Sequence, residues 1–375
     1  MKNTHLVFCM PAFGIGGAEK VLVHLLDELR LFEHMRITVI SNAEITNPFF
    51  KSWFNDRPDI KVHVLNFTTP RPSGFFSQNI WRIKRFIARK HIMRAYINIT
   101  KDADLVIDYL NFHARRYMQY IKRPKVAFYH SSINYFVQDN VQKFVRYYDK
   151  VIALSDSFVA DYKALFPNTA NKVMRIYNPI RIKEIQELAC GADCPLDPKY
   201  FIVCCRMHWH KDINTVLYAF DKFSSETTHK DIKLYLVGDG EKRAEWQNLA
   251  QTLPSSDRII FTGEKSNPLG YIKNAMALIM SSYNEGLPFV LCEAQSLNTL
   301  CIASNCKSGT GEIVQHGNAG LLFEAGDING LANAMHQVAD TSIDIQALTS
   351  NATQGLARFE PKSIALEIVN LMNVI

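Results

Sequence analysis

The chain has 375 residues, of which 47% are hydrophobic and 21% charged, a balance typical of a soluble globular protein with two domains of ordinary size. Lysine and arginine exceed aspartate and glutamate by 42 − 36 = 6. This mild, dispersed excess suits anionic ligands and argues against nucleic acid as a partner. No apolar run in the sequence approaches the length that spans a bilayer. Several of the eight cysteines lie inside apparent strands, so we expect reduced thiols in a cytoplasmic protein.

Short apolar runs alternate with helical patterns along the whole chain, which predicts an α/β fold with two doubly wound, Rossmann-like domains facing each other across a cleft. In the first half we expect strands at Leu6–Met10, Arg36–Ser41, Lys61–Leu65, Leu105–Tyr109, Lys125–Tyr129, Val151–Ser155 and Val173–Tyr177. In the second half we expect them at Phe201–Cys205, Lys233–Val237, Arg258–Thr262, Ala277–Ser281, Leu300–Ala303 and Gly320–Phe323. The segment Ile180–Tyr200 is predicted to be irregular and to hold the domain boundary. Pro361–Ile375 has helical apolar spacing and predicts a terminal helix packed on the body.

A glycine turn joins the first expected strand to an amphipathic helix. Its sequence is Gly14-Ile15-Gly16-Gly17-Ala18-Glu19, and the helix that follows has apolar residues at complete i, i+3, i+4, i+7 spacing. Such a turn lets backbone amides approach a phosphate, although it could also serve packing alone. The dinucleotide fingerprint requires a third glycine where Glu19 stands, which disfavours an NAD-dependent oxidoreductase.

A basic loop follows the strand Phe201–Cys205. Arg206 and Lys211 come after the carboxyl end of that strand, where a pyrophosphate could lie. Arginine offers planar, multidentate contact and lysine a point charge, so the pair could neutralise a diphosphate. The alternative is solvated surface charge. Val237-Gly238-Asp239-Gly240 then predicts a second strand with a glycine turn, for which structural and functional interpretations are equally open.

The most informative segment runs from Glu285 to Glu293, Glu-Gly-Leu-Pro-Phe-Val-Leu-Cys-Glu. A buried strand precedes it, and Pro288 suits the first position of a helix. We therefore expect Glu285 on the loop at the strand's carboxyl end and Glu293 about one turn into the helix. Open parallel sheets bind ligands at such crevices, and the free amides of the helix start suit a phosphate.

In this order, these elements resemble the retaining glycosyltransferases of the GT-B fold, in the family 4 group that includes bacterial lipopolysaccharide, capsule and O-antigen transferases. The resemblance covers nearly the whole chain. It also includes Tyr177-Asn178-Pro179, Phe261-Thr262-Gly263 and Gly311-Glu312-Ile313-Val314. It implies an acceptor-binding domain at residues 1–180, a nucleotide-sugar-binding domain at 181–358, and a helix at 359–375 that crosses back to the first domain.

The resemblance also implies roles for individual residues. Glu293 would bind the ribose hydroxyls of the donor nucleotide, and Glu285 the hydroxyls of its sugar. Arg206 and Lys211 would stabilise the leaving diphosphate, and His130 would face the sugar near the reacting carbon, although a lone histidine after a strand is more often structural. The remaining donor contacts would come from backbone at Gly16, Gly17, Gly263, Gly286, Leu287, Pro288, Phe289 and Val290.

Several positions depart from the family pattern or suggest a metal. Cys205 and Asn298 stand where the family usually has glycine, and Ser308-Gly309-Thr310-Gly311 replaces a tight glycine pair. Asp102-Ala103-Asp104 has the spelling of the metal-binding DxD motif, but it precedes a strand and is interpreted as a loop. Cys190 and Cys194 could be metal ligands, but no second pair accompanies them. We therefore expect neither a metal nor a bound cofactor, with the nucleotide sugar as a substrate.

The expected activity is transfer of a hexose or N-acetylhexosamine, from a UDP-sugar in preference to other donors, to a saccharide or lipid-linked saccharide of a bacterial surface glycan. The alternatives are a GT-B sugar-nucleotide epimerase and a non-catalytic sugar-nucleotide-binding subunit. Residues Ile80 to Arg94 mix six arginines and lysines with Trp81 and Phe86 at roughly helical spacing. This pattern fits a peripheral contact with the inner face of the plasma membrane, or equally a solvated helix with one face in the core.

Overall fold

A computed structural model describes residues 4–14, 17–66, 75–197, 199–226, 228–306 and 309–375, with the backbone alone described in residues 75–85. Contacts divide the chain into two compact units. Unit 1 comprises Met1–Leu154, Phe158–Pro179 and Pro361–Ile375, and unit 2 comprises Ser155–Ser157 and Ile180–Glu360. The last residues of the chain therefore belong to the first unit.

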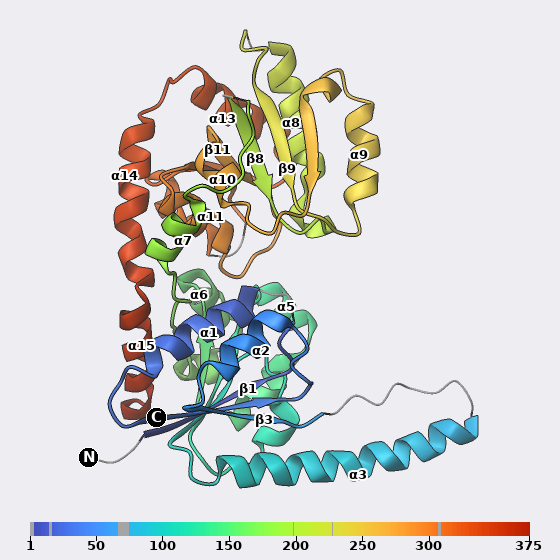
Figure 1. The fold of residues 1–375 in the computed structure, drawn as a ribbon, viewed down its shortest axis with the longest axis vertical. Helices are drawn as coiled ribbons and strands as arrows, with labels where there is room; N and C mark the ends of the chain where they lie inside the picture. The colour runs from blue at the N-terminus through green and yellow to red at the C-terminus, as the bar shows by residue number, and fades with distance from the viewer. Residues whose placement is uncertain (1–3, 15–16, 67–74, 198, 227, 307–308) are drawn as a thin grey trace. The chain divides into compact units, whose positions relative to one another are not determined.

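Unit 1 is built on a seven-stranded parallel sheet in the order β3-β2-β1-β4-β5-β6-β7. Its strands are β1 Thr4–Met10, β2 Met35–Ser41, β3 Ile60–Val64, β4 Leu105–Asp108, β5 Lys125–Tyr129, β6 Lys150–Ala153 and β7 Val173–Arg175. The helices are α1 Gly17–Leu29, α2 Pro48–Asn55, α3 Phe75–Thr100, α4 Arg115–Met118, α5 Ile133–Gln138, α6 Asp156–Leu165 and α15 Pro361–Asn370 (Figure 1). Short 3-10 turns lie at Val141–Tyr147, Pro167–Lys172 and Leu371–Asn373.

Helices bury their apolar stripes on both faces of this sheet, as doubly wound sheets require. The predicted stripe of α1 is confirmed, because Val21, Leu22, Leu25, Leu26 and Leu29 are all buried. Helix α1 packs against α15, whose Ile364, Ala365 and Ile368 are buried. A second cluster on this sheet contains many aromatic rings, among them Tyr96, Phe112, Tyr129, Phe136, Tyr148 and Tyr162.

Unit 2 is built on a six-stranded parallel sheet in the order β10-β9-β8-β11-β12-β13. Its strands are β8 Tyr200–Cys204, β9 Lys233–Val237, β10 Ile259–Gly263, β11 Ala277–Met280, β12 Leu300–Ser304 and β13 Leu321–Phe323. The helices are α7 Ile182–Ala189, α8 Ile213–Glu226, α9 Arg243–Gln251, α10 Leu269–Lys273, α11 Phe289–Ser296, α12 Thr310–Ile313, α13 Ile328–Ala339 and α14 Ile345–Gly355. Short 3-10 turns lie at Trp209–Lys211, Ser256–Arg258, Gln315–Gly317 and Leu356–Phe359.

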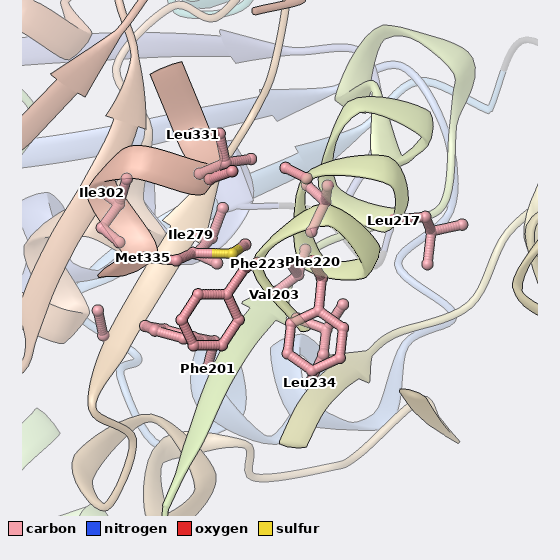
Figure 2. Packing of buried hydrophobic residues seen from close by; sticks show 14 of the residues in the cluster. Phe201, Val203, Leu217, Phe220, Phe223, Leu234, Ile279, Ile302, Leu331 and Met335 are labelled. Atoms are coloured by element: carbon pink, nitrogen blue, oxygen red, sulfur yellow. The ribbon is translucent and has the colours of Figure 1, made fainter. Parts of the chain in front are cut away.

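The core of unit 2 forms where α8 and α13 lie side by side on the sheet. Figure 2 shows Phe220 and Phe223 of α8 meeting Phe201 and Val203 of β8, with Met335 of α13 beside them. All of these side chains are at most 3% exposed. The central strands β8, β11 and β12 are buried at nearly every position, as expected of parallel strands covered on both faces.

All thirteen predicted strands are present, with ends that differ by at most two residues. The prediction of an irregular segment at Ile180–Tyr200 is wrong, because α7 occupies Ile182–Ala189. This helix packs on α10 and α11, and the Gln186 side chain donates to the backbone carbonyl of Ser296. This short helical pattern was missed because Gly191, Pro195 and Pro198 follow it closely in the sequence.

None of the described helices combines the length and the apolarity that crossing a bilayer requires. The eight cysteines are all free thiols, and Cys190 and Cys194 are exposed.

Two glycines after β9 let the backbone pass directly behind the loop that follows β8. Gly238 and Gly240 have φ of +131° and +156°. A Cβ at Gly238 would lie 1.9 Å from the carbonyl oxygen of Cys205, and one at Gly240 would lie 2.4 Å from that of Met207. The Met207 amide also donates to the carbonyl of Asp239 at 2.8 Å. Only glycine fits this approach, which fixes the course of residues 205–207.

Replacing Gly238 by alanine should therefore destabilise unit 2 by more than about 2 kcal/mol, since a backbone clash adds to the unfavourable φ. Gly191→Ala provides the control, because Gly191 has φ of +72° but open space around its Cβ position. The free energy of unfolding of that variant should fall by only about 1 kcal/mol. Equal losses in urea unfolding of the two variants would show that the close approach at Cys205 is not tight.

Candidate functional site

The strand order of unit 2 creates a crevice at one edge of its sheet. β8 pairs with both β9 and β11, so the chain winds outward in opposite directions from this point. The loops after β8 and β11 therefore leave the same edge of the sheet as neighbours. The first loop carries Arg206 and Lys211, and the second carries Glu285.

An ion pair joins these two loops. Lys211 Nζ donates to Glu285 Oε1 at 2.5 Å, and their side chains are only 19% and 14% exposed. Burial by itself lowers the pKa of Lys211, but the Glu285 charge, followed by Cys205 and by the hydrogen bond to Glu285, outweighs burial and raises that pKa above its ordinary value. The lysine therefore stays cationic at neutral pH.

Serine side chains hold this ion pair in place. The Ser282 hydroxyl donates to the same Glu285 oxygen at 2.7 Å, and the Ser282 carbonyl accepts from the Ser304 hydroxyl at 2.7 Å. The Ser281 hydroxyl donates to the backbone carbonyl of Lys211 at 2.7 Å. Sequence reasoning missed both serines. The signal was their position directly between the buried strand and Glu285, where a buried hydroxyl requires a partner.

The rest of the basic loop contains an exposed arginine and a pair of histidines. The Arg206 guanidinium is exposed and makes no hydrogen bond or ion pair with another described residue. His208 Nδ1 and His210 Nδ1 lie 2.5 Å apart, and the His210 carbonyl accepts from the Tyr283 amide at 2.8 Å. Burial, followed by the charge of Lys211, lowers the pKa of His210 to about 4. The ring is therefore neutral at pH 7 and adds no charge beside Lys211.

Helix α11 carries the second glutamate on the side of the crevice. Glu293 is the fifth residue of Phe289–Ser296, as predicted, and is half-buried. Its charge lies near Cys204, the last residue of β8: burial, then Glu293, raises the pKa of the Cys204 thiol to about 12. The expectation that Pro288 occupies the first helical position is wrong by one residue. Pro288 is the N-cap with extended ψ of 98°, and Phe289 begins the helix.

A small pocket opens at the switch point between these elements. It is lined by Val203, Cys204, Cys205, Lys211, Ile279, Met280, Ser281, Ser282 and Val290. Of the backbone positions expected to contact a donor, Gly286 to Pro288 lead into α11, Phe289 and Val290 are its first two residues, and Leu287 is buried. Gly263 ends β10 with φ of +77°, and its carbonyl accepts from the Gly238 amide at 2.9 Å.

The structure explains one of the departures from the family pattern. Asn298, which replaces a glycine, has φ of +59°, the left-handed conformation that asparagine tolerates better than most residues. At Cys205 the backbone is the part in close contact, because a Cβ on Gly238 would meet the Cys205 carbonyl. Residues 307 and 308 of the replaced glycine pair lie outside the described part of the chain.

In unit 1, His130 directly follows β5. Its amide donates to Asn111 Oδ1 at 2.7 Å, and its ring packs against Tyr109 with centroids 4.8 Å apart. Burial lowers the pKa of His130 to about 4, opposed only by a hydrogen bond of the ring to the Tyr109 backbone. Nε2 is buried and has no hydrogen-bond partner among the described residues. The neutral ring thus donates to Tyr109 through Nδ1 and leaves the Nε2 lone pair unused.

Two further expected features of unit 1 are at its glycine loop and before β4. Gly17 is exposed at the start of α1, and Gly16 lies outside the described residues. Asp102-Ala103-Asp104 is a loop, as interpreted: Asp102 pairs with Arg36 at 2.6 Å and Asp104 accepts from the His5 amide at 2.9 Å. Within the described ranges no three His, Cys, Asp or Glu side chains gather as a metal site would require.

Two family descriptions match the chain, one in each half. Residues 15–184 match Glycosyltransferase Family 4, and residues 192–355 match Glycosyl transferases group 1. Together they cover most of both units.

Individual relatives agree with these matches. A lipopolysaccharide 1,6-galactosyltransferase of Salmonella typhimurium is 28% identical over 48% of this chain and 49% of its own length. The Campylobacter jejuni N-acetylgalactosamine-N,N'-diacetylbacillosaminyl-diphospho-undecaprenol 4-alpha-N-acetylgalactosaminyltransferase is 20% identical over 96% of this chain and 97% of its own. The chain spans 32% to 49% of the length of the first curated relatives it matches.

Among solved structures, Anabaena HepE in complex with UDP has a TM-score of 0.75 at 18% identity over the full length of both chains. A likeness at this identity concerns the fold. With two all-parallel, doubly wound sheets and a family match in each half, the chain belongs to the GT-B-fold glycosyltransferases, with a family 4 domain followed by a group 1 domain.

Proposed function

We propose that the protein transfers a hexose or N-acetylhexosamine from a UDP-sugar to a saccharide acceptor of a bacterial surface glycan, with retention of anomeric configuration and without a metal. The observation that carries this proposal is the Lys211–Glu285 ion pair at the switch point of unit 2, with the exposed Arg206 on the same loop.

The cations on the loop after β8 suit a diphosphate leaving group. Cleavage of a glycosyl–phosphate bond produces an oxocarbenium-like sugar and a diphosphate anion. Preorganised positive charge aimed at that anion is the largest catalytic contribution available to such a site. Arg206 would bind the phosphates as a planar fork, and Lys211, already oriented by Glu285, would supply a fixed point charge. These two cations would take the place of a metal.

The two oxygens of the Glu285 carboxylate would have different partners, one in the protein and one in a ligand. Its Oε1 accepts from both Lys211 and Ser282, whereas Oε2 accepts no hydrogen bond from a described residue. Oε2 would therefore receive hydroxyl groups of the donor sugar. Glu293 would bind the ribose hydroxyls, and the amides at the start of α11 would bind phosphate or sugar oxygens.

Retention would then follow without a carboxylate nucleophile. Glu285 is held in an ion pair and Glu293 lies on a helix with a nucleotide role, so neither is free to attack the anomeric carbon. The departing phosphate would deprotonate the acceptor on the same face of the sugar. His130, neutral because its pKa is about 4, would accept a hydrogen bond from a sugar hydroxyl through Nε2.

The names of the relatives support the class of acceptor. The Salmonella relative is named for lipopolysaccharide, and the Campylobacter relative for a diphospho-undecaprenol-linked saccharide. A lipid-linked acceptor would require a protein that works at a membrane surface, such as the cytoplasmic face of the plasma membrane.

Helix α3 is the candidate membrane contact. The predicted helix across residues 80–94 is present within Phe75–Thr100. In its described side chains, Phe86 is 59% exposed and Ile87 50% exposed, and Lys90 and Arg94 are exposed as well. Lys90 Nζ lies 4.7 Å from the centre of the Phe86 ring. Exposed aromatic and basic side chains on one helix fit an anionic bilayer surface.

The two glutamates should separate binding from transfer. Glu293→Ala removes charged hydrogen bonds to ribose and should weaken UDP binding about 10- to 100-fold in calorimetry. Glu285→Gln should leave UDP affinity within about threefold but lower kcat for UDP release from a donor by about 10²-fold or more. Glu245→Ala, an exposed glutamate of α9, serves as the control. Tight UDP binding without turnover of any donor in a panel would instead favour a non-catalytic subunit.

Charge reversal on α3 should abolish membrane binding. We expect that a variant with four substitutions to glutamate, at Arg82, Lys84, Arg85 and Arg89, no longer sediments with vesicles of about 30% anionic lipid. Each basic residue near such a surface contributes about 1 kcal/mol to the free energy of membrane binding. Wild-type binding should also fall as salt rises. The matched control reverses four exposed cations elsewhere in unit 1, Lys51, Arg116, Lys122 and Lys163. If both variants bind equally well, α3 is a solvated helix.

A further inference from the structure

Unit 1 has a switch point of its own, between β1 and β4. Three neighbouring strands, β1, β4 and β5, end at this edge of the sheet. A polar residue follows each of them: Glu19 in the first turn of α1, Tyr109 directly after β4, and His130 directly after β5.

The Tyr109 hydroxyl is the clearest of the three. The residue is 0% exposed, and its Oη has no hydrogen-bond partner among the described residues. Its ring is held by Phe8, Phe128 and His130, with centroids 4.8 to 6.2 Å apart. A buried hydroxyl without a partner destabilises a fold, and native structures contain few of them. A phenylalanine would fill the same space without this penalty, so packing does not explain the hydroxyl.

The two neighbours of Tyr109 have complementary chemistry. His130 Nε2 is a buried acceptor, because Nδ1 is used by the Tyr109 backbone. Glu19 Oε1 lies 4.0 Å from the position of a Cβ on Gly14, so its carboxylate points back toward Gly14. Burial, and then the charge of Glu19, raises the pKa of Tyr109, so its hydroxyl remains a donor at neutral pH.

We propose that Glu19, the Tyr109 hydroxyl and His130 Nε2 form a subsite for the hydroxyl groups of one sugar ring at the carboxyl ends of β1, β4 and β5. A sugar hydroxyl both donates and accepts, and this subsite offers two acceptors and one donor. The inference rests on the proposed function for its sugar, which is either that of the donor or that of the acceptor. His130 had been expected to face the sugar from the family resemblance, whereas Tyr109 and Glu19 are new assignments.

A pair of tyrosines makes a matched test. Tyr109 and Tyr148 are both buried in unit 1, but the Tyr148 hydroxyl donates to Asp108 Oδ2 at 2.6 Å. Tyr109→Phe should unfold at a temperature no lower than the wild type, because it loses no internal hydrogen bond. Tyr148→Phe should unfold about 2–4 °C lower.

In their kinetics we expect the two variants to differ in the opposite way, with Tyr109→Phe the more affected. Tyr109→Phe should raise KM for one sugar substrate about 5- to 30-fold, the effect of one lost hydrogen bond, and Glu19→Gln should raise KM for the same substrate. A rise for the UDP-sugar assigns the subsite to the donor, and a rise for the saccharide assigns it to the acceptor. Tyr148→Phe should change neither. Unchanged KM values for both substrates in Tyr109→Phe would overturn the subsite. The Tyr109 hydroxyl would then be assigned to a bridging water.

Failure of the proposed function can be told apart from failure of this subsite. If the wild type releases UDP from no donor, the proposed function falls, and saturation-transfer NMR with methyl glycosides of galactose and N-acetylglucosamine decides the subsite. A signal in the wild type that is lost in Tyr109→Phe supports it. Equal signals in the two proteins, or no signal in the wild type, overturn it.

Discussion

The candidate site of unit 2 depends on the ion pair between Lys211 and Glu285. Removing two charges from water costs several kcal/mol per ion, and a buried pair offsets this only with good geometry and further hydrogen bonds. Ser282 supplies one of these bonds to Glu285, and Ser281 fixes the backbone of Lys211. The pair also keeps the lysine cationic despite burial, and a cation at this position is what a diphosphate requires.

The fold makes this pair possible through its strand order and two glycines. β8 lies between β9 and β11, so the loops that carry the two charges start as neighbours. Gly238 and Gly240 then allow the backbone after β9 to run against Cys205 and Met207. The loop after β8 is therefore hydrogen-bonded on one side to the backbone at the end of β9 and just after it, and on the other side to Ser281 and Tyr283. A side chain on either glycine would displace the loop and with it the lysine.

The two units treat buried polarity differently. In unit 2 the buried charges are paired and bonded before any ligand arrives. In unit 1 the buried Asp108 carboxylate accepts from Tyr148, whereas two neutral groups, the Tyr109 hydroxyl and His130 Nε2, have no partners among the described residues. Neutral unpartnered groups cost less than unpaired charges, so a unit can retain them where a ligand completes their hydrogen bonds. Unit 2 thus fits a charged ligand such as a diphosphate, and unit 1 a polyhydroxylated one.

Most of the fold followed from local patterns in the sequence. Alternation of short apolar runs with helical stripes predicted every strand, and the spacing around Glu285 and Glu293 predicted a strand, a loop and a helix there. Helix α7 was missed because its apolar residues are few and flanked by proline and glycine. The predicted helix start at Pro288 was wrong by one residue, because an N-cap and a first helical position have similar sequence preferences. The role of Tyr109 could not be predicted, since nothing in the sequence says which buried hydroxyl lacks a partner.

The sequence by itself determined the class of fold, the glycine turns and the residue types available for phosphate and sugar chemistry, because periodicity and turn preferences act over a few residues. Only the tertiary structure decided which of these residues meet. Lys211 and Glu285 are 74 positions apart, and their contact depends on β8 and β11 pairing side by side. That pairing results from burial of both strands in one core, a long-range effect that local patterns do not encode.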